Sequence, residues 1–299
     1  MADTGDAALV YLDNNATTIM PPEVVDTVIR WMNRGDPSAE YASAREARKM
    51  MQRFRQLLAV DGGFELEGPL GYTVLFTSGG SEGNCHVANA AARAYAARTG
   101  KLPHIIVSAV EHKSLLTCCL QLARDRIIQL TVLPVRTCTA GTGRRPPTGD
   151  TGTVDPEELR KAIRPNTCLI SIMAANNETG AINDLRGLGA IAHAARIPFH
   201  TDAVQLFGKS TIRPTELNLD AFSGSFHKLH GPPGVGFLAV RNDFVEGYGL
   251  GALVCGNQNE GLRGGTENLP GIAGAFAAYK RAVTKRGDKN RQMRRLRDG

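Results

Sequence analysis

Short β-rich runs alternate with helical patterns through the middle of this 299-residue chain, and this alternation limits the possible folds more than any other feature. Near-continuous apolar runs predict strands at residues 73–76, 105–108, 130–134, 168–173, 198–201, 221–225 and 236–240. Helical patterns cover 82–98, 114–125, 156–163 and 184–195, and two further helices, 22–32 and 43–60, precede the first strand. Such alternation predicts an α/β fold, in which helices flank both faces of a mainly parallel sheet.

The composition is that of a folded globular protein. With 42% hydrophobic and 21% charged residues, the chain can bury a substantial core. No apolar run approaches the roughly 20 residues that span a bilayer, and the N-terminus has neither a signal pattern nor an Arg-rich transit pattern. The six cysteines include no CxxC pair and no zinc-ligand spacing. We therefore expect reduced thiols, no metal site, no membrane partner and a cytoplasmic location.

The formal charge of +6 is distributed unevenly along the chain. Residues 280–299 contain nine basic and two acidic residues, a net charge of +7, whereas residues 1–279 are nearly neutral at −1. A near-neutral body does not favour nucleic acid as a partner. The basic segment is either a charged arm or the solvated face of a helix, and we expect the helix.

A glycine turn follows the first predicted strand and leads into a helix. In the sequence FTSGGSEGN (76–84), Gly80 and Ser81 stand where free backbone N–H groups and the positive end of the helix would meet. This arrangement suits a phosphate, with Ser81 both capping the helix and donating its hydroxyl. A simple tight turn with a serine cap explains the pattern equally well. Neither GxGxxG nor GxxxxGK[ST] is present, which counts against dinucleotides and nucleoside triphosphates.

Polar residues also follow four of the other predicted strands. His112 could stack on a flat ligand or move protons, and Asn177 supplies an orienting amide. Asp202, at a buried strand tip, needs a cationic partner or a proton, and Lys228 is positioned for the lowered pKa that a Schiff-base amine requires. Singly, each has an ordinary structural explanation. Together they are what pyridoxal phosphate requires of a protein: a phosphate cradle, a ring stacker, a partner for the ring nitrogen and a lysine.

Seven stretches extend this pattern to a known family. They are YLDNNATT (11–18), FTSGGSEGN (76–84), SAVEHKS (108–114), ANNETG (175–180), HTDAVQ (200–205), SFHKLHGPPGVG (225–236) and RGGTENLPGIAG (263–274). The chain resembles the class V aminotransferase family, in its cysteine desulfurase and selenocysteine lyase branch. The resemblance implies the large domain of a fold type I pyridoxal-phosphate-dependent transferase. It divides the chain into an N-terminal segment (1–20), a cofactor-binding domain (21–279) and a basic helical tail (280–299).

The resemblance also implies roles for individual residues. Lys228 would hold pyridoxal 5′-phosphate covalently, and His112 would stack on the ring and take part in proton transfer. Asp202 would pair with the ring nitrogen, while Gln205, helped by Asn177, would bind the phenolic oxygen. The phosphate would be held by Gly80, Ser81, Ser225 and His227. Thr266 resembles a threonine that reaches the phosphate of a neighbouring subunit, which implies a homodimer.

In the family, L-cysteine is converted to L-alanine, and its sulfur passes as a persulfide of an enzyme cysteine to an acceptor protein, for example in iron–sulfur cluster assembly. The persulfide-bearing cysteine and an arginine that binds the substrate carboxylate follow the RGGTEN segment. None of the six cysteines here occupies that position, so we expect the C-terminal small domain to be largely missing and the full activity to be reduced. Two alternatives stay open: a selenocysteine lyase acting on L-selenocysteine, and a non-catalytic cofactor-binding or scaffold relative.

Overall fold

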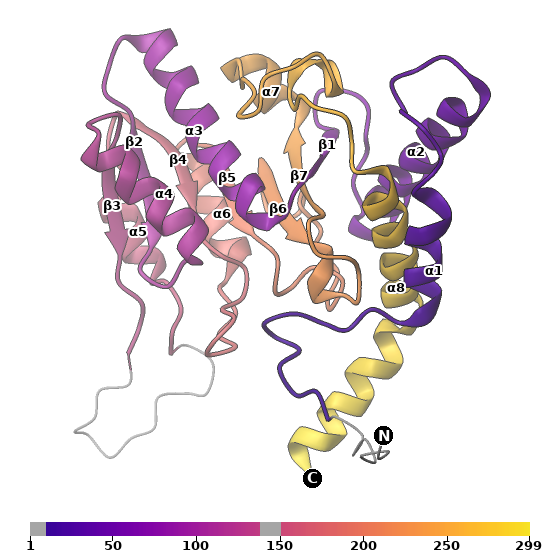
Figure 1. The fold of residues 1–299 in the computed structure, drawn as a ribbon. Helices are drawn as coiled ribbons and strands as arrows, with labels where there is room; N and C mark the ends of the chain where they lie inside the picture. The colour runs from indigo at the N-terminus through magenta and orange to yellow at the C-terminus, as the bar shows by residue number, and fades with distance from the viewer. Residues whose placement is uncertain (1–9, 138–150) are drawn as a thin grey trace, which may run out of the picture.

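A seven-stranded sheet forms the centre of the computed structural model, which describes residues 10–137 and 151–299 (Figure 1). The strands are β1 (Tyr72–Thr77), β2 (His104–Ser108), β3 (Gln129–Leu133), β4 (Thr167–Ser171), β5 (Phe199–Asp202), β6 (Ala221–Ser225) and β7 (Gly236–Arg241). All seven predicted strands are therefore confirmed, with ends displaced by up to two residues. The segment 137–153, whose Gly, Pro and Thr residues predict an exposed loop, lies mostly outside the described residues.

The strands follow the order β1-β7-β6-β5-β4-β2-β3 across the sheet. The pairings from β3 to β6 are parallel, whereas β7 runs antiparallel to both of its neighbours, β6 and β1. The prediction of a mainly parallel sheet is thus confirmed. Because β2, β4, β5 and β6 share one direction, their carboxyl ends meet at one edge, where α/β proteins bind their ligands.

The six predicted helices are confirmed as α1 (Pro22–Trp31), α2 (Ala42–Gly62), α3 (Gly80–Thr99), α4 (Lys113–Arg124), α5 (Pro156–Ala162) and α6 (Leu185–Ala194). The described residues also form α7 (Asn242–Tyr248), α8 (Leu269–Asp298) and the short 3₁₀ turns η1 (Phe226–Lys228) and η2 (Asn259–Gly261). Helix α7 and the first part of α8 were not predicted. None of the described helices is both long and apolar enough to cross a membrane.

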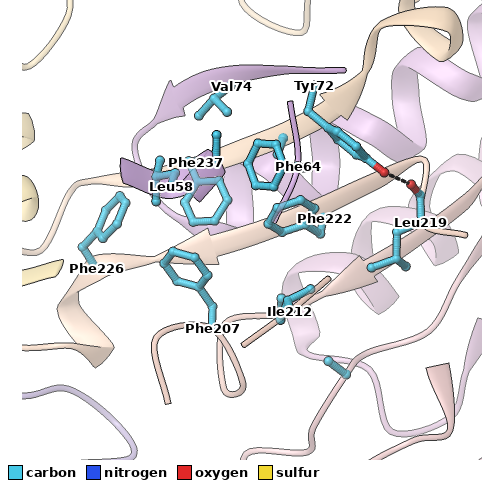
Figure 2. Packing of buried hydrophobic residues seen from close by; sticks show 14 of the residues in the cluster. Leu58, Phe64, Tyr72, Val74, Phe207, Ile212, Leu219, Phe222, Phe226 and Phe237 are labelled. Carbon is cyan, nitrogen blue, oxygen red and sulfur yellow. Dashed lines mark hydrogen bonds between the residues drawn. The ribbon is translucent and has the colours of Figure 1, made fainter. Parts of the chain in front are cut away.

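Apolar side chains on the two faces of the sheet belong to two separate cores. Along β7, Phe237 and Ala239 join the core under α2, α5, α6 and α8, whereas Leu238 and Val240 join the core under α3, α4 and α7. Figure 2 shows part of the first core, where Phe237 packs against Phe222 with ring centroids 5.6 Å apart. The alternation of side chains along each strand therefore fixes which helices cover which face.

Tyr72 anchors one side of this aromatic core. The side chain is fully buried, and its hydroxyl donates to Leu219 O at 2.5 Å (Figure 2). A buried phenol needs such a partner because an unpaired hydroxyl would lose its hydrogen bonds to water.

Helix α8 lies alongside α1 at one side of the sheet and continues to the C-terminal end of the chain (Figure 1). It begins at Leu269, so residues 280–298 prolong an existing helix. The sequence pattern does not predict this start, because two glycines lie near it and glycine disfavours helices. At Gly274 the reason for glycine is spatial: an added Cβ would lie 2.5 Å from Val28 Cγ2 on α1.

The basic end of α8 is not wholly solvated, which corrects the expectation for residues 280–299. The side chain of Arg286 is 14% exposed and forms a 2.6 Å ion pair with Asp61 Oδ2 on α2. Tyr279 donates its hydroxyl to the same oxygen at 2.5 Å. Asn290 Nδ2 also donates to Lys209 O at 3.0 Å. This part of the helix is held because its polar groups find partners on α2 and on the segment between β5 and β6.

Candidate active site

A cavity of about 430 Å³ lies at the carboxyl ends of the parallel strands. Its walls come from the N-terminal segment, the start of α3, the loops after β2, β4 and β5, and η1. The lining residues are Asp13, Asn15, Ala16, Gly80, Ser81, Asn84, His112, Ser114, Met173, Asn177, Glu178, Asp202, Val204, Gln205, Ser225, His227 and Lys228. Nine of the ten predicted site residues thus line one cavity.

Lys228 ends the 3₁₀ turn that follows β6. Its Nζ donates to the main-chain oxygens of Asn15, at 2.5 Å, and Ala16, at 2.7 Å. Burial lowers the pKa of the amine, although the nearby carboxylates of Asp13 and Asp202 act in the opposite direction. A lowered pKa increases the fraction of neutral amine, which is the nucleophilic form.

Asp202 is the last residue of β5, and only 5% of it is exposed. Its carboxylate accepts from Val204 N at 2.9 Å and from Asn84 Nδ2 at 2.7 Å. Burial raises the pKa of this carboxyl group. Both donors are neutral, so within residues 10–137 and 151–299 the carboxylate has no ion-pair partner. It therefore fits a ligand with a protonated ring nitrogen, because a buried carboxylate is stabilised by a cation that hydrogen-bonds to it.

The start of α3 provides the end of the cavity suited to an anion. The helix begins at Gly80, after Gly79, and has no side-chain cap. Ser81 is therefore its second residue, and the prediction that Ser81 caps the helix is wrong because the helix starts earlier than expected. An added Cβ at Gly80 would lie 2.5 Å from Val204 Cγ2, which requires glycine there. Ser81 and Ser225 also line the cavity, and an added Cβ at Gly80 would lie 3.8 Å from Ser225 Cβ.

His227 also lines the cavity and precedes Lys228 in the chain. Its Nδ1 lies 3.1 Å from Thr17 Oγ1, and its main-chain oxygen accepts from Thr18 N at 2.9 Å. Burial, and then the charge of Lys228, lowers the pKa of the imidazole. The N-terminal segment is thereby tied to η1 over a separation of more than 200 residues.

His112 is the N-cap residue of α4. Its Nδ1 accepts from Ser114 N at 3.2 Å and lies 2.8 Å from Ser114 Oγ. Ser114 Oγ in turn accepts from Asn84 Nδ2 at 3.1 Å. These bonds fix the ring through Nδ1, and no described residue hydrogen-bonds to Nε2.

Two side-chain amides that were predicted to belong to the site, those of Asn177 and Gln205, also line the cavity. Asn177 Nδ2 donates to Glu178 Oε1 at 2.6 Å. Gln205 Nε2 donates to Asn15 O at 3.3 Å, and its Oε1 accepts from Lys209 Nζ at 2.8 Å. Gln205 is thus already oriented toward the segment that contacts Lys228.

Thr266 is the one predicted site residue outside the cavity. It is exposed, in the segment between η2 and α8. Arg263, three residues earlier, pairs with Glu82 on α3 at 2.9 Å, so this segment is attached beside the start of α3. The predicted contact of Thr266 with a second subunit stays a prediction.

Sequence reasoning gave no role to two buried polar residues at this site, Asn84 and Glu111. Asn84 stands one helical turn after Gly80, and this spacing on one helix face could have indicated it. Glu111 Oε1 accepts from Ser108 Oγ at 2.5 Å and from Met173 N at 2.9 Å, while Oε2 has no partner. Burial raises the pKa of Glu111 to about 8. The described residues contain no group of three or more His, Cys, Asp or Glu side chains that could hold a metal ion.

Known proteins match both the sequence and the fold. The model of the family "Aminotransferase class-V" matches residues 10–294. A cysteine desulfurase IscS of Methanosarcina thermophila is 38% identical over 293 residues, which cover 97% of this chain and 66% of that protein. The chain thus spans about two thirds of the length of this relative.

Two solved structures extend the comparison to the fold. A NifS-like protein superposes with a TM-score of 0.82 at 32% identity, over 97% of this chain and 73% of that one. SspA in complex with cysteine gives a TM-score of 0.77 at 33% identity, over 91% and 72%. A lysine, a buried aspartate and a capping histidine around one cavity agree with these matches, and the chain belongs to the class V aminotransferase family, whose members depend on pyridoxal phosphate.

Proposed function

We propose that this chain binds pyridoxal 5′-phosphate in the cavity and acts on L-cysteine as a cysteine desulfurase-like enzyme. The observation that carries the proposal is that Lys228 and the unpaired carboxylate of Asp202 line one cavity with the glycine turn at Gly80. The cysteine desulfurase relative and the cysteine-bound structure support the substrate.

Lys228 would hold the cofactor covalently, since burial favours its neutral amine. Asp202 would keep a proton on the ring nitrogen, and Asn84 with Val204 N would orient the carboxylate for that contact. When bound, pyridoxal phosphate supplies an electron sink for charge that develops at the α-carbon of an amino acid.

His112 would lie against the ring and hold or transfer a proton at Nε2, because Nδ1 is already engaged by Ser114. Gln205 and Asn177 would hydrogen-bond the phenolic oxygen. The phosphate would be held by the N–H groups at the start of α3 and by Gly80, Ser81, Ser225 and His227.

Titration with pyridoxal phosphate tests the proposal directly. The wild-type chain should develop an absorption band near the edge of the visible range, and Lys228→Ala should lack it. Lys161→Ala is the matched control, because Lys161 pairs with Glu158 on the exposed side of α5. A wild-type chain that shows no band would overturn cofactor binding.

L-Selenocysteine is the alternative substrate, and the release of selenide and sulfide under identical conditions separates the two. Equal rates would leave a lyase assignment unsupported. Sulfur transfer to an acceptor protein is part of the same proposal, and sulfide release with and without an added thiol measures it. None of the six cysteines stands at the family's persulfide position, so we expect a low rate without that thiol.

We also propose a homodimer in which Thr266 contacts the phosphate of the neighbouring site. Sedimentation would measure the oligomer, and Thr266→Ala should weaken cofactor binding without changing the mass of the complex. The division into residues 1–20, 21–279 and 280–299 and a cytoplasmic location are further parts of the proposal. Limited proteolysis and cell fractionation test them.

A further inference from the structure

Two thiols outside the cavity face each other across the contact between α3 and α4. Cys85, in the second turn of α3, donates to Ser114 O at 3.4 Å, and its thiol also hydrogen-bonds with that of Cys118. Cys118 stands one turn after Ser114 on α4. Asn89, one turn after Cys85, donates Nδ2 to Cys118 Sγ at 3.4 Å. Each sulfur is therefore held between two residues of the opposite helix that are spaced i, i+4.

The surroundings make the two thiols chemically different. The hydrogen bond from Cys85, with the amide of Asn89, lowers the pKa of Cys118 to about 7, whereas the pKa of Cys85 is raised. Both side chains are partly buried, while Cys119 is fully buried and its pKa is raised by burial. Of these three thiols Cys118 is thus the most easily ionised, and thiolates are the reactive form of cysteine.

We propose that Cys85 and Cys118 form a reversible dithiol–disulfide pair that low-molecular-weight disulfides oxidise. Formation of the disulfide shifts the residues beneath the cavity. The Cys118 thiolate attacks one sulfur of the small disulfide, whose S–S bond breaks and releases one thiolate. Cys85 then loses its proton to water and attacks Cys118 Sγ in the mixed disulfide, which releases the second thiolate. The two cysteines lose two electrons in all, and the small disulfide is reduced to two thiols.

The pair is directly connected to the cavity. Cys85 follows Asn84, which donates to Asp202, and Ser114 links Asn84 to His112. A disulfide bond is about 2.05 Å long, much shorter than a contact between two thiols. Its formation therefore draws together the turns of α3 and α4 that carry Asn84 and Ser114. The effect on the cofactor rests on the proposed function, whereas disulfide formation does not.

Peptide mapping after treatment with oxidised glutathione tests disulfide formation. Trypsin gives the peptide 56–93, in which Cys85 is the one cysteine, and the peptide 114–124, which contains Cys118 and Cys119. We expect these peptides to be linked before and separate after treatment with dithiothreitol. Cys85→Ser and Cys118→Ser should abolish the link, whereas Cys119→Ser should keep it and so identify Cys118.

Exposed Cys255 is the internal control for the oxidant. Glutathione on Cys255 without any link between the two peptides would overturn the pair.

Cofactor titration of the same samples tests the effect of the disulfide on the site. Oxidised wild type should bind pyridoxal phosphate about 2- to 30-fold more weakly than reduced wild type, and Cys118→Ser should bind equally before and after oxidation. Equal affinity of oxidised and reduced wild type would overturn the connection to the cavity.

Discussion

Asn84 Nδ2 donates a 2.7 Å hydrogen bond to Asp202 Oδ2, which joins the second turn of α3 to the tip of β5 beneath the cavity. Both residues are at most 5% exposed, so removal of the donor leaves a largely buried carboxylate with one hydrogen bond fewer. The bond therefore helps to hold the Asp202 carboxylate in the position in which it would contact a ligand.

We expect Asn84→Ala to weaken the binding of pyridoxal phosphate about tenfold, because a buried acceptor that loses its donor costs about 1–3 kcal/mol. Absorbance titration measures the affinity. Asn166→Ala is a suitable control, since Asn166 precedes β4 at the opposite edge of the sheet and bonds to Leu102 O. Equal affinities of Asn84→Ala and wild type would contradict the role of Asn84.

Glu111 should make stability depend on pH. Its pKa is about 8 in the folded protein, against an ordinary value of 4.5. The folded state therefore holds a proton that the unfolded state releases, and this contribution to stability is complete below about 4.5 and is lost as the pH rises through about 8. Chemical denaturation across this range should show a steeper fall for wild type than for Glu111→Gln. Glu246→Gln, at an exposed site, should follow wild type.

The ion pair between Arg286 and Asp61 should stabilise the attachment of α8. Both side chains are at most 14% exposed, and removal of one partner leaves a largely buried charge. We expect Arg286→Ala to lower the free energy of unfolding by about 3 kcal/mol. Arg291→Ala should change it by less than about 1 kcal/mol, because Arg291 and Asp288 are more than 70% exposed. Similar losses of unfolding free energy in the two variants would show that burial does not determine how much the Arg286–Asp61 pair stabilises the protein.

Two glycines of α8 should respond to alanine with opposite signs. At Gly274 a Cβ would lie 2.5 Å from Val28 Cγ2, so Gly274→Ala should destabilise the protein by about 1–3 kcal/mol. At Gly287 the nearest atom is Arg291 Nη1 at 3.6 Å, so Gly287→Ala should stabilise it by about 0.5–1 kcal/mol. Thermal unfolding of both variants gives the signs.

The sequence alone predicted the features that depend on local patterns. Continuous apolar runs predicted the strands. The polar residues that follow these runs were predicted to lie together at one edge of the sheet, where the strands end. Lys228 and Asp202 lie on one cavity because β5 and β6 are parallel neighbours.

The remaining features depend on contacts between distant segments. The main-chain oxygens of Asn15 and Ala16 that receive Lys228 lie more than 200 residues away in the chain, and the stretch that contains them does not indicate this contact. Likewise, Gly274 disfavours a helix locally but fits α8 because α1 packs closely against it there.

The antiparallel position of β7 between β6 and β1 determines when the cavity can form during synthesis. The glycine turn before α3 follows β1, yet among the described strands β1 pairs only with β7, at residues 236–241. Gly236 packs so closely on Gly79 that an added Cβ would lie 2.5 Å from the Gly79 carbonyl carbon. A ribosome must therefore translate more than 150 further residues after Gly79 before the glycine turn at this end of the cavity has its support. A nascent chain released earlier carries Gly80 and Ser81 but lacks the strand that fixes them.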